Sequence, residues 1–189
     1  MRILTFLFVL FLCGAACSGG DGRRGAGAGP ERSEPARAAI EARLIGELSP
    51  GNDRAARERN ALINRAIDGN FDVYPAPEGY FYEILSPGQF NPLRENDHVA
   101  AHYSGYFLDG RVFDDSRRRN EKLRFYVGQL IPAWNLALLR VRPGASLRLL
   151  VPSALAYGAA GLAAPNGDTL VPAHTPLEFL IEEVELLED

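Results

Sequence analysis

An apolar and aromatic set of residues, with one acid at its edge, lies between residues 102 and 171. Its members fall on several predicted strands, one short helix and one long loop, so only folding could gather them: Tyr103, Phe113, Asp114, Leu130, Ile131, Trp134, Tyr157, Leu170 and Val171. No serine–histidine elbow, phosphate-binding loop or metal-ligand cluster accompanies them. Such residues suit a reaction whose obstacle is rotation about an amide bond, which costs about 18–20 kcal/mol, rather than bond cleavage.

Length and charge set the outer bounds. The chain has 189 residues, 47% of them hydrophobic, and a formal net charge of −4. That is enough material for one globular domain with additional segments. The excess of acids argues against nucleic acid as a partner. The histidines at 98, 102 and 174 lack metal-ligand spacing, and we expect neither a metal nor a cofactor.

The first sixteen residues have the pattern of a secretory signal. Arg2 precedes an apolar run from Ile3 to Leu12, shorter than the roughly 20 residues needed to span a bilayer. Small residues follow, and then Cys17. This arrangement resembles the acylation site of bacterial lipoproteins, although Gly14 replaces the usual leucine. The alternative is ordinary cleavage that leaves a free thiol.

The lipoprotein resemblance implies a location. It predicts a lipid anchor on Cys17, and hence a membrane as one partner of the chain. Ser18 follows where an aspartate would imply retention, so the resemblance favours outer-membrane sorting. We therefore expect a chain in the envelope of a Gram-negative-type bacterium, anchored at the outer membrane and facing the periplasm.

Composition divides the chain into four regions: a signal peptide at 1–16, a flexible tether at 17–34, a helical segment at 35–75 and a main domain at 76–189. Ser33 marks the first helix start, and Asp53 could cap a second helix that runs through Ile67. The apolar stripes of these helices could pair with each other, with the main domain, or with a second copy in a homodimer through residues 35–68. We favour packing within the chain.

From residue 80 onward the periodicity changes to that of strands. Strands are predicted at 80–84, 98–107, 111–114, 123–127, 146–151 and 177–187. Asp109-Gly110 is a tight-turn signal, and Pro132 opens a short helix that runs through Arg140. The predicted fold class is therefore α+β, an antiparallel β-sheet wrapped around one short α-helix and preceded by an N-terminal helical segment.

Six segments in the same order resemble the FKBP-type peptidyl-prolyl cis-trans isomerase domain. They cover residues 79–187 and include 102–105, 108–114, 125–134, 152–158, 171–177 and 184–187. The resemblance implies an enzyme that catalyses rotation about Xaa-Pro bonds in exported or envelope proteins, without a cofactor. Its partners would be proline-containing polypeptides.

The resemblance also implies two groups of site residues. Catalytic residues would be Tyr103, Phe113, Asp114, Ile131, Trp134, Tyr157 and Phe179, and substrate-binding residues would be Arg119, Leu123, Leu130, Leu170 and Val171. Trp134 would form the floor under the proline ring, while the Ile131 N–H and the Tyr157 hydroxyl would bind the substrate backbone. Asp114 would lie beside the twisting amide, oriented by Tyr103 and paired with Arg119.

These residues also have structural interpretations. Trp134 could be ordinary core, and Asp114 could be a turn residue that binds local backbone. Leu123 stands where well-known relatives carry an aromatic, and the loop at 159–169 is longer than usual. The arginines at 117–119 form either an anion site or a solvated rim. The chain could thus be an isomerase, a weak peptide-binding chaperone that uses the same groove and the helices, or a structural lipoprotein. The aromatic set with Asp114 favours the isomerase.

Overall fold

A computed structural model describes residues 32–188. The predicted signal peptide, Cys17 and most of the tether lie outside the described residues. The helices are α1 (Glu34–Gly46), α2 (Arg54–Asp68) and α3 (Pro132–Leu138), with 3₁₀ turns η1 (Arg117–Arg119) and η2 (Ser153–Leu155). The strands are β1 (Tyr74–Pro75), β2 (Phe81–Ser86), β3 (His98–Phe107), β4 (Val112–Asp115), β5 (Leu123–Tyr126), β6 (Ser146–Val151), β7 (Leu162–Ala163), β8 (Thr169–Val171) and β9 (Leu177–Leu186).

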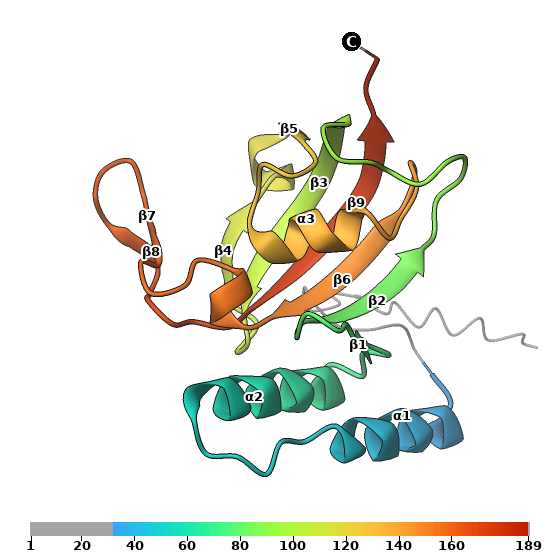
Figure 1. The fold of residues 1–189 in the computed structure, drawn as a ribbon, viewed down its shortest axis with the longest axis vertical. Helices are drawn as coiled ribbons and strands as arrows, with labels where there is room; N and C mark the ends of the chain where they lie inside the picture. The colour runs from blue at the N-terminus through green and yellow to red at the C-terminus, as the bar shows by residue number, and fades with distance from the viewer. Residues whose placement is uncertain (1–31, 189) are drawn as a thin grey trace, which may run out of the picture.

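An antiparallel sheet in the order β1-β2-β6-β9-β3-β4 forms the body of the molecule, with β5 also paired to β3. β3 is long enough to hold β4 and β5 at successive positions along one edge while β9 pairs along the other. Figure 1 shows α3 lying across one face of this sheet. The α+β prediction, including the preceding helices, is confirmed.

β6 divides its side chains between two cores. Leu147, Leu149 and Val151 join the core beneath α3, and Leu150 joins a second core with the helical segment. Successive side chains of a strand point to opposite faces, so both faces of this strand are buried. The second core consists of Leu44, Leu62, Ile63, Ala66, Phe71, Val73, Phe81 and Leu150.

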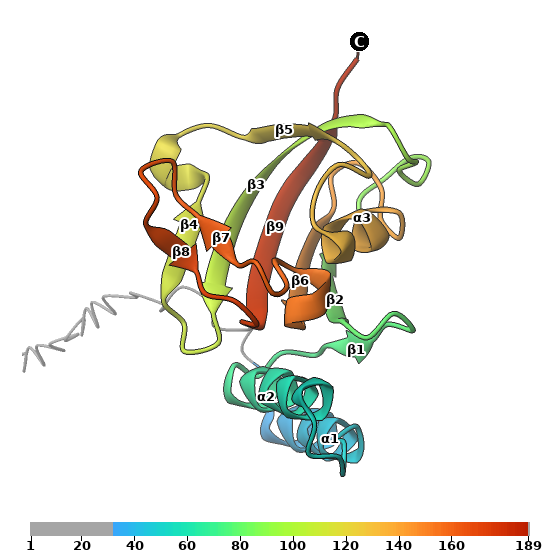
Figure 2. The same cartoon turned by 60° about the vertical axis from the view of Figure 1, so that its left-hand side comes forward.

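The helical pair α1–α2 begins and ends close to its predicted limits. The Asp53 side chain accepts a hydrogen bond from the Ala56 N–H at 2.8 Å and caps α2 as expected. Both helices lie on the side of β1 and β2 that is remote from α3 (Figures 1 and 2). The apolar stripes therefore pack within the chain. The large apolar side chains of residues 35–68 that remain exposed, and so available to a second copy in a homodimer, are Ile45 and Leu48.

Several element limits differ by a few residues from the sequence predictions. β4 begins at Val112 rather than at 111, and α3 ends at Leu138 rather than at Arg140 because the next residues tighten into i→i+3 hydrogen bonds. The loop at 159–169 is also not irregular throughout. Its turn at 166–168, with Gly167 at φ +88°, brings β7 against β8 as a small hairpin.

A row of buried charges joins α2 to the sheet. Glu178 is 0% exposed and receives hydrogen bonds from Arg148 and Arg65, the latter at 2.7 Å. Arg148 also lies 3.5 Å from Glu83, and its guanidinium stacks 3.6 Å above the Phe71 ring. Buried charges are tolerated when they are paired and hydrogen-bonded. This row therefore fixes how the helical segment lies on the sheet.

Replacing Glu178 with glutamine would remove the counter-charge of the partly buried Arg65 and one of the two acids beside the buried Arg148. We expect Glu178→Gln to lower the free energy of unfolding by about 3 kcal/mol, measured by urea denaturation. The control is Glu182→Gln, which removes an acid on the same strand whose partner, Arg117, is exposed. It should cost less than about 1 kcal/mol. Equal losses in the two variants would contradict the assigned role of the buried row.

Candidate functional site

Trp134 is the centre of the aromatic set. Pro132 starts α3 directly after the extended residue Ile131, which turns the indole down onto the sheet. The indole is 3% exposed and is met edge-on by three rings, with centroid separations of 5.5 Å to Tyr103, 6.0 Å to Phe125 and 5.6 Å to Phe179. Edge-to-face pairs of this kind each add about 0.5–1.5 kcal/mol beyond area burial. Among residues 32–188 the Trp134 Nε1–H has no hydrogen-bond partner.

Phe113 extends the cluster from the core to the surface. Its partly exposed ring lies 5.9 Å from Phe179 and 6.5 Å from Tyr157, both in edge-on geometry. The ring lies across Gly105 of β3, where an added Cβ would come within 2.5 Å of the Phe113 ring. Glycine at position 105 is therefore what allows Phe113 to reach this position.

Asp114 is bound from two sides. Its carboxylate accepts hydrogen bonds from the Tyr103 hydroxyl and from the Arg119 guanidinium, which also donates to the Tyr103 oxygen at 2.9 Å. The Asp115 N–H donates to the same carboxylate at 2.8 Å. The local-backbone and oriented-carboxylate interpretations of Asp114 therefore both hold.

These contacts keep the three groups in fixed protonation states. Burial, followed by the hydrogen bond to Asp114, raises the pKa of Tyr103 to about 12. Burial alone would raise the pKa of Asp114, but the hydrogen bonds from Tyr103 and Arg119 and the Arg119 charge outweigh it and lower that pKa. Tyr103 is therefore protonated and Asp114 ionised throughout the neutral range.

Tyr157 approaches the cluster from the loop after η2. It is half-buried, and burial, with a smaller effect from the charge of Asp114, raises its pKa. Within the described chain its hydroxyl makes no hydrogen bond. A protonated hydroxyl therefore lies beside Phe113 and is available to an incoming group.

The backbone before α3 is held by one side chain. Asn135 accepts from the Gly128 and Leu130 N–H groups at 3.2 and 3.1 Å, and it donates to the carbonyl oxygens of the same two residues at 3.1 and 2.8 Å. The next N–H, that of Ile131, makes no hydrogen bond within residues 32–188. Asn135 therefore orders the loop that presents the Ile131 donor.

The predicted substrate-binding residues are placed unequally. Leu123 and Leu130 are partly buried and pack against the core, whereas Val171 is fully buried within it. Leu170 is 38% exposed and is not part of the cluster. The structure thus gathers the predicted catalytic residues, and it leaves Leu170 outside them.

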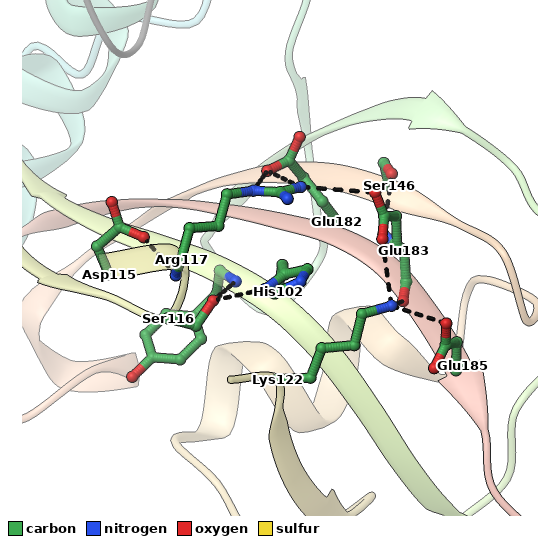
Figure 3. Close-up of polar contacts among 10 residues, drawn as sticks. His102, Asp115, Ser116, Arg117, Lys122, Ser146, Glu182, Glu183 and Glu185 are labelled. Atoms are coloured by element: carbon green, nitrogen blue, oxygen red, sulfur yellow. Dashed lines mark hydrogen bonds and ion pairs between the residues drawn. The ribbon is translucent and has the colours of Figure 1, made fainter. Parts of the chain in front are cut away.

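Ser116 holds the backbone of Tyr103 in place. Its buried hydroxyl accepts the Tyr103 backbone N–H at 2.9 Å and contacts His102 Nδ1 at 3.1 Å (Figure 3). These bonds hold the start of η1 against β3. His102 thus has a structural role, and no group of three potential ligands in the described part of the chain could hold a metal.

The arginines at 117–119 each face an acid. Arg117 pairs with Glu182 and Glu183, Arg118 with Asp115, and Arg119 with Asp114. Figure 3 shows Arg117 reaching across to the glutamates of β9. Because their charges are matched within the chain, these residues form a solvated rim rather than an anion site.

Phe125 and Asn135 belong to the site but were not predicted. The alternation of β5 places Phe125 on the same face as Val127 in the core, and this signal could have shown that its ring meets Trp134. No local pattern distinguishes Asn135 from a solvated helical asparagine. Its partners depend on how the preceding loop folds back.

The ionised Asp114 predicts a specific pH dependence of stability. Because folding lowers the Asp114 pKa, its contribution is present above the ordinary value of 3.8 and is lost as the pH falls through the lower folded value. We expect Asp114→Asn to cost about 1–2 kcal/mol of unfolding free energy at neutral pH. This difference from the parent chain should shrink below about pH 4.

The measurement is urea unfolding between pH 3 and pH 8. In a Tyr103→Phe background the carboxylate loses one donor, so the same substitution should cost less. A difference that stays constant down to pH 3, or that Tyr103→Phe leaves unchanged, would contradict this assignment.

Comparison with known proteins adds independent findings. Residues 91–186 match the family model for FKBP-type peptidyl-prolyl cis-trans isomerase. The isomerase FkpA of Escherichia coli strain K12 is 34% identical over 143 residues, which cover 71% of this chain and 50% of FkpA. The outer membrane protein MIP of Legionella longbeachae is 29% identical over 147 residues, covering 76% of this chain and 60% of MIP.

The solved structures agree with the sequence comparison. The crystal structure of FkpA from Escherichia coli superimposes with a TM-score of 0.58 at 26% identity, over 79% of this chain and 64% of that one. The chain spans about half of the length of the FkpA sequence that it matches. No helix within residues 32–188 is both long and apolar enough to cross a bilayer.

Proposed function

The chain belongs to the FKBP-type peptidyl-prolyl cis-trans isomerase family, and we propose that it catalyses rotation about Xaa-Pro peptide bonds in proline-containing polypeptides. The observation that carries the proposal is the arrangement around Trp134. A buried indole is framed edge-on by rings from three strands, with one ionised carboxylate and one free hydroxyl at the margin.

The chemistry requires no group to be transferred. The barrier of about 18–20 kcal/mol arises from amide resonance, and the uncatalysed Xaa-Pro rotation takes tens to hundreds of seconds. A twisted amide carries less charge separation than a planar one, so an apolar surface disfavours it less than water does. Each 1.36 kcal/mol by which the protein binds the twisted form better accelerates rotation about tenfold.

The position of each site residue suggests its role in binding the substrate. Trp134 supports the proline ring, and Tyr103, Phe113 and Phe179 form the apolar walls around it. The unpaired N–H of Ile131 and the hydroxyl of Tyr157 donate to substrate carbonyl oxygens. Both donors lie in the described structure without a competing acceptor.

Asp114 is placed beside the twisting amide, at the margin of the aromatic cluster. Its carboxylate is oriented by Tyr103 and Arg119, so its position and charge beside the twisting amide are fixed before a substrate binds. Leu123 and Leu130 are partly exposed and form the outer contacts for flanking residues, whereas the buried Val171 contributes to the apolar wall. Because neither Asp114 nor Tyr103 titrates between about pH 5 and pH 9, they impose no pH dependence on the rate in that range.

The alternative of a client-holding chaperone has less support. A chaperone of this kind would use the same groove together with the helices at 35–68, and the apolar faces of these helices are buried against β2 and β6. Exposed large apolar side chains on this segment are limited, within the described chain, to Ile45 and Leu48.

We expect the full chain to accelerate cis-trans exchange in a short Xaa-Pro peptide, measured by magnetisation-exchange NMR. Tyr157→Phe and Asp114→Ala should each lower kcat/KM by roughly three- to thirtyfold, the loss of about one hydrogen bond in the transition state. Tyr126→Phe is the matched control, because this exposed tyrosine stacks on His98 away from Trp134. An inactive parent chain, or equal activity in all variants, would contradict the proposal.

We propose further that the chain is exported and anchored through Cys17, a residue outside the described structure. Support comes from the signal-like residues 1–16 and from the outer-membrane name of the Legionella longbeachae relative. Exported or envelope proteins would then be its clients, and the tether at 17–34 would hold the domain near the membrane.

Membrane fractionation of a Gram-negative host tests the anchor. The parent chain should partition with the membrane, and Cys17→Ser should shift it to the soluble periplasmic fraction, since attached acyl chains supply the membrane affinity. The control is Cys13→Ser, which changes the other cysteine and lies within the predicted signal. Membrane retention of Cys17→Ser would rule out this anchor.

A further inference from the structure

Glu58 of α2 has a buried carboxylate that binds one residue of the main domain, Ser153. Glu58 is 8% exposed, and its two oxygens accept hydrogen bonds from the backbone N–H of Ser153 at 2.7 Å and from the Ser153 hydroxyl at 2.8 Å. Within residues 32–188 it forms no ion pair. A buried carboxylate without a cation is costly unless such donors satisfy it. The Glu58–Ser153 contact is therefore a specific link between the helical segment and η2.

Ser153 in turn holds both neighbours of Tyr157. Its carbonyl oxygen accepts the N–H of Ala156 at 3.1 Å and the N–H of Gly158 at 2.8 Å. The Gly158 carbonyl then accepts from His174 at 2.8 Å. Movement of Ser153 would thus move the backbone on either side of the Tyr157 ring.

Packing does not fix this turn on the side that faces α2. A groove of about 850 Å³ lies between the two elements and is lined by Ala55 and Glu58 on α2 and by Ala154, Leu155 and Gly158 in and after η2. In Figure 2, η2 is the short orange coil after β6, at the end of the sheet nearer to α2. The groove leaves η2 incompletely supported there, and the contacts that cross it are the two hydrogen bonds of Glu58 to Ser153 and the contact between Arg54 of α2 and His174.

We propose that Glu58 is a positioning residue of the isomerase site, which acts on Tyr157 through Ser153. The inference rests on the proposed function, and it extends that function to a helix outside the family match at residues 91–186. The helical segment thereby helps to place the hydroxyl that binds the substrate backbone.

The test compares Glu58→Ala and Glu58→Gln in the full chain. Glu58→Ala should lower kcat/KM for Xaa-Pro exchange about tenfold, and Glu58→Gln, which keeps one acceptor, about threefold. In a Tyr157→Phe background, Glu58→Ala should change the rate by less than about twofold, because the hydroxyl that it positions is absent. Equal effects in both backgrounds, or none, would overturn the inference.

Glu47→Ala is the matched control. It removes a carboxylate after α1 that binds Arg59 at 2.5 Å and does not touch Ser153. Its rate should equal that of the parent chain. A loss as large as that of Glu58→Ala would show that any disturbance of the helical segment has the same effect, which also overturns the inference.

A second readout needs no substrate. Amide hydrogen exchange at Gly158, whose N–H is bound to Ser153, should be at least about tenfold faster in Glu58→Ala and unchanged in Glu47→Ala. Ser153→Ala, which removes only the hydroxyl bond, should give a smaller increase and replaces Glu58→Ala if that variant does not fold. If the parent chain does not isomerise peptides, the proposed function fails, and unchanged exchange at Gly158 separately overturns the positioning role.

Discussion

The contact between the Trp134 indole and three surrounding rings is the interaction on which the rest of the structure depends. It fixes α3 against β3, β5 and β9, and the same rings supply the apolar surface of the site. Stability and recognition therefore use one set of side chains. Within residues 32–188 the buried indole N–H has no hydrogen-bond partner, so contacts of the rings rather than a hydrogen bond of the indole hold Trp134 in this position.

The polar margin of this cluster is also pre-formed. Tyr103, Asp114 and Arg119 bind one another directly, and Ser116 fixes the Tyr103 backbone. On the loop side, Asn135 orders the turn before Ile131. Ordering these groups before a substrate arrives reduces the entropy lost on binding. Within the described residues, the Ile131 N–H and the Tyr157 hydroxyl are thus left free to donate hydrogen bonds to a bound peptide.

Local signals in the sequence predicted much of the fold and of the site. The limits of β3 and β6 follow from residue pattern, and the Asp53 cap follows from side-chain chemistry. The strand order β2-β6-β9-β3 does not follow from local pattern, because it depends on long-range pairing. In the sequence alone, a charged residue such as Glu178 looks like part of the solvent-exposed face of a strand. The residue of α2 that pairs with it, Arg65, is distant in the chain. The contact of Glu58 could not be predicted for the same reason, since its partner Ser153 lies 95 residues away in the chain.

The charge row between α2 and the sheet has a consequence for how this chain is divided. Residues 91–186 contain Arg148 and Glu178, whereas Arg65, Phe71 and Glu83 precede that stretch. A chain that began at residue 91 would lack Arg65 and Glu83, the partners of Glu178 and Arg148. It would also expose the apolar face of β6 that packs in the second core. The unit that shares these buried contacts is thus larger than the stretch matched by the family model, and it includes the helical segment.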